Sequence, residues 1–94
     1  IALTYDDGPY SPVTSRILDA LEAVGGRATF FNVGNRIGSY QDVAKRAVQI
    51  GCSISNHTWD HTSLTSLGSS SIVSEINGCD NAIKNYTGET SLLV

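Results

Sequence analysis

The sequence predicts an α/β protein in which parallel strands alternate with helices. Short apolar runs are separated by segments whose apolar residues recur every three or four positions, which is the pattern of strand–helix–strand units. Glycines follow these helical segments, and glycine commonly ends helices. Acidic residues and histidines come directly after strands of this pattern, so the fold class also predicts where a site would form.

The first strand is expected at residues 1–5, an apolar run that gives way to two acidic residues. A helix should follow over residues 13–24, because its apolar side chains repeat at helical spacing. These side chains are Val13, Ile17, Leu18, Leu21 and Val24. Gly25 and Gly26 should end this helix, and a second strand is expected at residues 28–33.

The second half of the sequence repeats the pattern. A helix over residues 41–50 should end at Gly51, and a short third strand follows at residues 52–55. Residues 56–67 are polar and should form a loop, with one turn that brings the two histidines to the same side. A third helix should begin at Ser69 or Ser70 and end at Gly88, before a fourth strand at residues 91–94.

The composition is that of a globular domain. Hydrophobic residues make up 40% of the 94 residues, charged residues 16%, and the net charge is −3, which disfavours binding to nucleic acid. No apolar run approaches the roughly 20 residues of a membrane span. Residues 1–5 have a strand pattern and lack the basic and apolar regions of an export signal, so we expect such a signal to have been removed or never included.

Two motifs carry groups that bind metals. Asp6 and Asp7 follow the first strand, and His57 and His61 follow the third. Each aspartate alone would be read as a turn residue, because Asp-Gly-Pro favours turns. The carboxyl ends of parallel strands meet at one edge, however, so a carboxylate and two imidazoles from these positions can meet at one divalent metal. We therefore predict a metal site formed from Asp7, His57 and His61.

These motifs resemble those of the polysaccharide deacetylases, the NodB-like carbohydrate esterase family 4. The similarity rests on Thr4-Tyr5-Asp6-Asp7-Gly8-Pro9 and His57-Thr58-Trp59-Asp60-His61, with further likeness over residues 27–34 and 51–61. It implies the N-terminal half of a distorted (β/α) barrel, with about four parallel strands and three helices. Later family motifs, R-x-P-Y, D-W-D and L-x-H, are not found in residues 1–94. We therefore expect residues 1–94 to be part of one catalytic domain, completed by a C-terminal segment present as a second chain.

The resemblance implies a metal-dependent hydrolase that removes acetyl groups from a polysaccharide outside the cell or at its surface. Asp7, His57 and His61 match the family's metal ligands, with zinc expected first and cobalt or nickel as alternatives. Asp6 matches the catalytic base. Neighbouring residues on a strand point to opposite faces, so a bend is needed for both aspartates to reach the site, and Gly8 would allow it.

Other residues near these motifs have weaker assignments. Thr58 matches a position that steadies the loop between the histidines, and Asp60 is a candidate for orienting an imidazole. Trp59 and Tyr10 are candidate contacts to a sugar, although a single exposed aromatic more often serves packing. Cys52 and Cys79 could pair in a secreted chain, and in a cytosolic one they would be buried thiols.

Three alternatives remain open from the sequence. A noncatalytic carbohydrate-binding remnant of the same fold would keep the strands and lose the chemistry. Two histidines and a carboxylate also serve non-haem iron oxygenases, but the alternation of strands and helices argues against their usual scaffold. The substrate is likewise open among O-acetylated xylan, chitin oligosaccharides and peptidoglycan. Asn85 starts a glycosylation sequon that matters only in a eukaryotic secreted protein.

Overall fold

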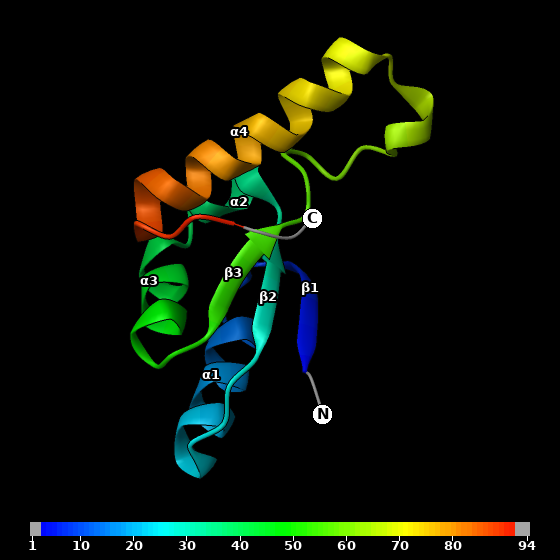
Figure 1. The fold of residues 1–94 in the computed structure, drawn as a ribbon. Coiled ribbons are helices and arrows are strands. Elements are labelled where there is room, and N and C mark those ends of the chain that lie inside the picture. The colour runs from blue at the N-terminus through cyan, green and yellow to red at the C-terminus, as the bar shows by residue number, and fades with distance from the viewer. Residues whose placement is uncertain (1–2, 92–94) are drawn as a thin grey trace.

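A three-stranded parallel sheet in the order β1-β2-β3 forms the centre of the fold. The structure is a computed structural model that describes residues 3–91 (Figure 1). The strands are β1 (Thr4–Gly8), β2 (Thr29–Asn32) and β3 (Ser53–Asn56). The helices are α1 (Val13–Val24), α2 (Gly34–Ile37), α3 (Gln41–Gln49) and α4 (Ser69–Thr87), with a 3₁₀ turn η1 (Leu64–Ser66) before α4.

The α/β class with parallel strands and intervening helices is confirmed. α1 ends at Gly25 and α4 at Gly88, and both glycines adopt the left-handed conformation expected at a helix end. Two short elements, α2 and η1, were not predicted, because three or four residues are too few to show a periodic pattern. The fourth strand was expected over residues 91–94, of which residues 92–94 lie outside the described part of the chain.

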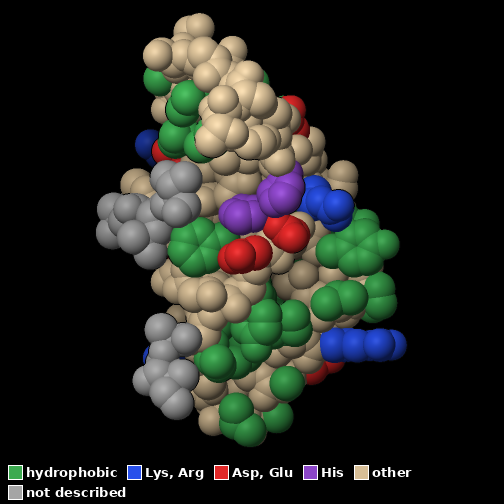
Figure 2. Space-filling view, turned by 90° about the vertical axis from the view of Figure 1, so that its right-hand side faces the viewer, with side chains coloured by type: hydrophobic (Ala, Val, Ile, Leu, Met, Phe, Trp, Pro, Cys, Tyr) green, Lys and Arg blue, Asp and Glu red, His purple; other side chains and the backbone are tan. Residues whose placement is uncertain are grey.

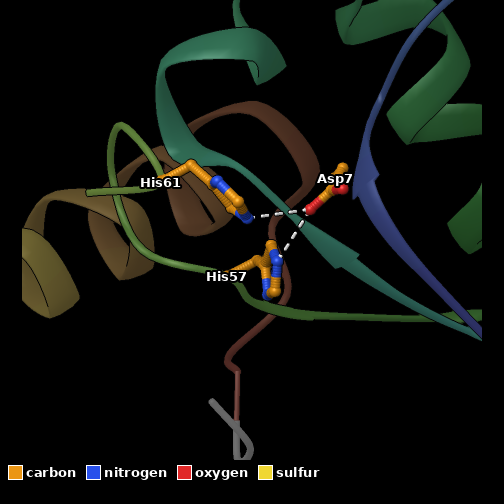
Figure 3. A group of neighbouring side chains, drawn as sticks. All are labelled: Asp7, His57 and His61. Atoms are coloured by element: carbon orange, nitrogen blue, oxygen red, sulfur yellow. Dashed lines mark ion pairs between the residues drawn. The ribbon is translucent and has the colours of Figure 1, made fainter. Parts of the chain in front are cut away.

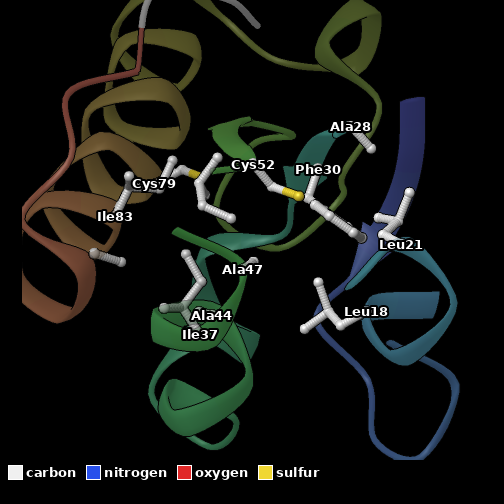
Figure 4. Close-up of a cluster of buried hydrophobic side chains, with 12 residues drawn as sticks. Leu18, Leu21, Ala28, Phe30, Ile37, Ala44, Ala47, Cys52, Cys79 and Ile83 are labelled. Atoms are coloured by element: carbon white, nitrogen blue, oxygen red, sulfur yellow. The ribbon is translucent and has the colours of Figure 1, made fainter. Parts of the chain in front are cut away.

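The hydrophobic core lies between the sheet and the helices (Figure 4). Phe30 of β2 and Ile54 of β3 are almost fully buried, as is Leu18 of α1. The other helices add smaller apolar side chains to the same cluster. These include Ile37, Ala44, Ala47, Cys79, Ala82 and Ile83. Burying each large apolar side chain stabilises the fold by about 1.5–3 kcal/mol, so this cluster holds the sheet and its site in place.

Cys52 and Cys79 are buried free thiols, so the disulfide considered from the sequence is not formed. Cys52 comes just before β3, whereas the thiol of Cys79 on α4 donates to the backbone carbonyl of Asn32, which is the last residue of β2. Asn32 pairs with Asn56 in the sheet, so the two cysteines lie at opposite ends of the strands. Four strand residues span about 13 Å, whereas a disulfide needs Cα atoms about 4.4–6.8 Å apart.

Among the helices of residues 3–91, none has the length and apolar character needed to cross a bilayer.

Candidate metal centre

A bulge in β1 sets the direction of the two acidic side chains. Asp6 pairs with Phe31 and Gly8 pairs with Asn32, which leaves Asp7 as the extra residue between them. Asp7 adopts the left-handed conformation, with φ of 69°. Aspartate tolerates this conformation better than most residues do, and a bulge re-aims side chains along a strand. The bend expected at Gly8 is therefore at Asp7, and both carboxylates border the same surface hollow of about 600 Å³.

His57 and His61 bring their imidazoles to Asp7 (Figure 3). The Nε2 atom of His57 lies 2.8 Å from Oδ1 of Asp7, and Nε2 of His61 lies 3.1 Å from the same oxygen. One ligand atom from each residue fits within a group whose members are at most 4.8 Å apart. The side chain of His57 is 28% exposed, that of His61 59% and that of Asp7 67%, so the cluster is open to solvent.

The loop between the histidines is held by its own hydrogen bonds. The backbone N–H of His57 donates to the carbonyl of Asn32, which extends the pairing of β2 and β3 by one residue. Thr58 and His61 both have positive φ angles, of 66° and 67°. The hydroxyl oxygen of Thr58 accepts the backbone N–H of His61 at 3.1 Å. This hydrogen bond joins two residues of the loop between the histidines, which is the loop that the sequence analysis expected Thr58 to steady.

Asn56 is a positioning residue that the sequence analysis missed. Its side chain is fully buried and makes three hydrogen bonds. Its Nδ2 donates to the carbonyl of Ile76 at 2.7 Å and to the carboxylate of Asp80 at 2.8 Å, both on α4. Its Oδ1 accepts the backbone N–H of Thr58 at 2.8 Å. The available signal was an amide that directly follows the predicted third strand and directly precedes a histidine.

Trp59 packs away from the two aspartates. A side-chain carbon at Gly34 would come within 2.8 Å of the indole, so only glycine fits where the ring lies against α2. On α4, a side-chain carbon at Gly78 would lie 3.6 Å from Trp59, which is an ordinary packing distance. Trp59 borders a second hollow together with Ala82 and Tyr86 of α4. The structure therefore does not bring Trp59 together with Asp6 in one hollow.

Tyr10 does share a hollow with Asp6 and Asp7. Its ring lies 5.8 Å from that of Tyr40, and the guanidinium of Arg36 lies 5.4 Å from its centre. Of the two aromatic side chains proposed as sugar contacts, Tyr10 is thus the one placed beside the acidic pair.

Asp60 does not orient an imidazole in the described part of the chain. Its carboxylate accepts hydrogen bonds from the backbone N–H of Thr62 at 3.0 Å and from the Thr62 hydroxyl at 2.5 Å. These bonds, led by the one from the hydroxyl, hold the pKa of Asp60 below its ordinary value. Asp60 therefore serves as a turn residue that shapes the loop after His61.

The donor set fits a divalent metal. Two imidazole nitrogens and one carboxylate oxygen are the ligands of hydrolytic zinc sites, which leave a further position open for water or substrate. The same three atoms converge here from β1 and from the loop after β3. Such a site suits hydrolysis in which a carboxylate, here Asp6 in the adjoining hollow, can accept a proton.

The chain belongs to the polysaccharide deacetylase family, whose sequence profile matches residues 1–94. Among curated relatives, peptidoglycan-N-acetylmuramic acid deacetylase PdaC of Bacillus subtilis is 38% identical over 94 residues, which are 100% of this chain and 20% of the relative. A bifunctional xylanase/deacetylase of Pseudobutyrivibrio xylanivorans is 40% identical over 89 residues, covering 94% of this chain and 15% of that protein.

Solved structures show the same fold. PdaC from Bacillus subtilis matches with a TM-score of 0.93 and 37% identity over 96% of this chain and 45% of that chain. A family 4 acetyl xylan esterase from Clostridium thermocellum, in complex with cobalt, matches with a TM-score of 0.91 and 35% identity over 96% of this chain and 44% of that chain. The described elements correspond to the N-terminal part of the NodB-like deacetylase fold, and this chain spans less than half of these solved chains.

Proposed function

We propose that this site removes acetyl groups from a polysaccharide by metal-dependent hydrolysis. The observation that carries the proposal is the convergence of Asp7, His57 and His61 within 4.8 Å, with Asp6 beside them in the same hollow as Asp7. Family membership supports the reaction class, and the cobalt reported for the esterase neighbour supports a divalent ion. We expect zinc as the ion, with cobalt or nickel able to replace it.

The residues divide the chemical work. Asp7, His57 and His61 would hold the ion through Oδ1 and the two Nε2 atoms that already face one another. When bound, the ion supplies a Lewis acid that stabilises negative charge on the acetyl carbonyl. Asp6 accepts the proton of the attacking water and so acts as the general base. The products are acetate and a sugar carrying a free hydroxyl or a free amine.

We extend the proposal to the setting of the reaction. The substrate is an acetylated polysaccharide, and the named relatives act on peptidoglycan or carry a xylanase as well as a deacetylase. A polymer of this kind is met outside the cell or at its surface, which is where we place the protein. Because solved relatives are about twice as long as this chain, we propose that activity requires a further segment, in the same or a second polypeptide.

The test is to measure bound zinc and released acetate together in the full-length protein that contains this sequence. His57→Ala should lose most of the zinc and the acetate release, because it removes one of three ligands. Asp42→Asn is the control, since Asp42 is an exposed carboxylate on α3 and does not belong to the metal cluster. Full zinc occupancy and activity in His57→Ala would show that the assignment is wrong.

A further inference from the structure

Arg36 is the basic residue that lines both of the hollows that contain Asp7. It borders the hollow that contains Asp6, Asp7 and Tyr10, and it also borders a second hollow of about 300 Å³ with Asp7, Asp60 and His61. Figure 2 shows the result on the surface, where basic side-chain atoms lie directly beside the histidine and acidic groups.

The backbone of α2 fixes Arg36 relative to the histidine loop. The N–H of Gly34 donates to the carbonyl of Thr58 at 2.9 Å, and the N–H of Asn35 donates to the carbonyl of Trp59 at 2.8 Å. The loop that carries His61 is therefore bonded to the two residues before Arg36. The guanidinium itself lies 5.4 Å from the centre of the Tyr10 ring. A cation so placed on an aromatic ring is held electrostatically without using its N–H groups.

Arg36 has no acidic partner among residues 3–91, although carboxylates border both hollows. The ion pairs of this part of the chain involve Arg46, His57 and His61, and the side-chain hydrogen bonds do not include Arg36. Its five N–H donors are thus available to a ligand, and their planar fork matches a carboxylate. The neighbouring carboxylates of Asp6, Asp7 and Asp60 would repel an anion. Only an anion that faces Arg36 would gain an attraction that offsets this repulsion.

We propose that Arg36, steadied by Tyr10, binds a carboxylate of the glycan next to the metal centre and so selects acetylated glycans that carry carboxylates. The inference rests on the proposed function for the identity of the glycan. Carboxylates of this kind occur in two sources, the lactyl ether of muramic acid and the uronic acid side groups of xylan. The shared chemistry is a carboxylate held within a few sugar units of the acetyl group.

The experiment compares matched ligands and matched variants of the full-length protein. The ligands are a muramic-acid-containing glycan strand without peptide, an acetylated glucuronoxylan fragment, and both glycans after reduction of their carboxylates to alcohols. Arg36→Gln removes the charge and Arg36→Lys keeps it without the planar fork. Arg16→Gln is the control, because Arg16 is an exposed arginine on α1 that borders neither hollow. Binding is measured by calorimetry, and acetate release is measured in parallel.

The unmodified protein should bind one carboxylate-bearing glycan about 10- to 100-fold more tightly than its reduced form, the range of a hydrogen bond to a charged group. Arg36→Gln should abolish that difference, Arg36→Lys should retain part of it, and Arg16→Gln should leave it unchanged. Added salt should weaken the preference, because screening weakens exposed charge pairs. The glycan that shows the preference identifies the source of the carboxylate.

Equal binding of the carboxylate and alcohol forms by the unmodified protein would overturn the inference. So would an equal loss of binding to both forms in Arg36→Gln, since that would indicate a general structural role. Absence of acetate release from every ligand would contradict the proposed function instead, and the binding comparison would still decide the role of Arg36.

Discussion

Asp6 and Asp7 are neighbours in the sequence but face different partners. Asp7 lies in the bulge of β1, where its Oδ1 contacts both imidazoles. Asp6 keeps its place in the pairing with β2 and forms no ion pair with either histidine in the part of the chain that the structure describes. A single extra residue in one strand therefore separates a candidate metal ligand from a candidate base.

The first prediction concerns this division of roles. Asp6→Asn should keep the zinc, because none of the three candidate ligands is changed, and should lower the rate of acetate release by about 10²-fold or more, the usual scale of general base catalysis. Metal analysis and a deacetylation assay on the same preparation give the two numbers. Loss of zinc from Asp6→Asn would mean that the two carboxylates share the ligand role.

The second prediction concerns the thiols. Burial raises the pKa of Cys79 from 9.0 to about 11, so the folded thiol stays protonated where an unfolded thiol would begin to ionise. At pH 8, iodoacetamide should label neither Cys52 nor Cys79 in the folded protein and both in urea without reductant. The contribution of Cys79 to stability is complete below about pH 9 and falls as the pH rises toward 11. Labelling in urea that requires a reductant would indicate a disulfide.

At the scale of elements, α4 holds the histidine loop through Asn56. The buried amide of Asn56 donates hydrogen bonds to two groups of α4 and accepts one from the backbone N–H of Thr58. The strand, the helix and the loop are therefore connected through one side chain. The Asn56 amide is fully buried, and a buried polar group left without a partner costs about 1–3 kcal/mol.

The third prediction follows from this arrangement. Asn56→Asp keeps the shape but turns the two donated bonds into repulsion with the carbonyl of Ile76 and the carboxylate of Asp80. It should lower the free energy of unfolding by about 1–3 kcal/mol and weaken zinc binding. Adding Asp80→Asn to this variant should restore part of the lost stability and part of the lost zinc binding. The new amide at position 80 can donate a hydrogen bond to the carboxylate at position 56, which the carboxylate of Asp80 could not do. Urea unfolding and a zinc titration measure the effects, and an unchanged zinc affinity would contradict a positioning role.

Long periodic elements were predictable from the sequence, and short or strained ones were not. The helix over residues 13–24 was predicted with the bounds of α1, because its apolar spacing and final glycines agree. The first strand was expected to end at Tyr5, whereas β1 continues to Gly8. Acidic residues are poor strand formers, but backbone pairing with β2 carries the strand through Asp6, and the bulge accommodates Asp7.

The closeness of the candidate ligands was predictable, because parallel strands run in one direction and their carboxyl ends meet at one edge of the sheet. The structure brings one ligand atom from each of Asp7, His57 and His61 within 4.8 Å of the others. That these residues bind a metal stays a prediction for binding measurements to test. Asn56 and Arg36 were not found, since their importance depends on contacts with α4 and with Tyr10 that come from distant parts of the sequence.

At the scale of the whole molecule, the candidate centre joins β1 to the loop after β3, the two outer strands of the sheet. The fourth prediction is that zinc raises the melting temperature of the full-length protein and that a chelator reverses the rise. Zinc at 100 times its dissociation constant should add about 2.7 kcal/mol, because only the folded state gathers the ligands. His57→Ala should show no such rise in a thermal scan, and an equal rise in that variant would place the zinc elsewhere.

The positive φ angles described above have a consequence for how this sequence can change over evolution. Among residues 3–91, the only non-glycine residues in the left-handed region are Asp7, Thr58 and His61. Each such residue typically holds about 1–3 kcal/mol of backbone strain. Selection for thermal stability alone would therefore favour glycine or asparagine at these positions, and above all at the β-branched Thr58. A variant selected only for stability would then be expected to lose activity, because stability and activity favour different residues at these three positions.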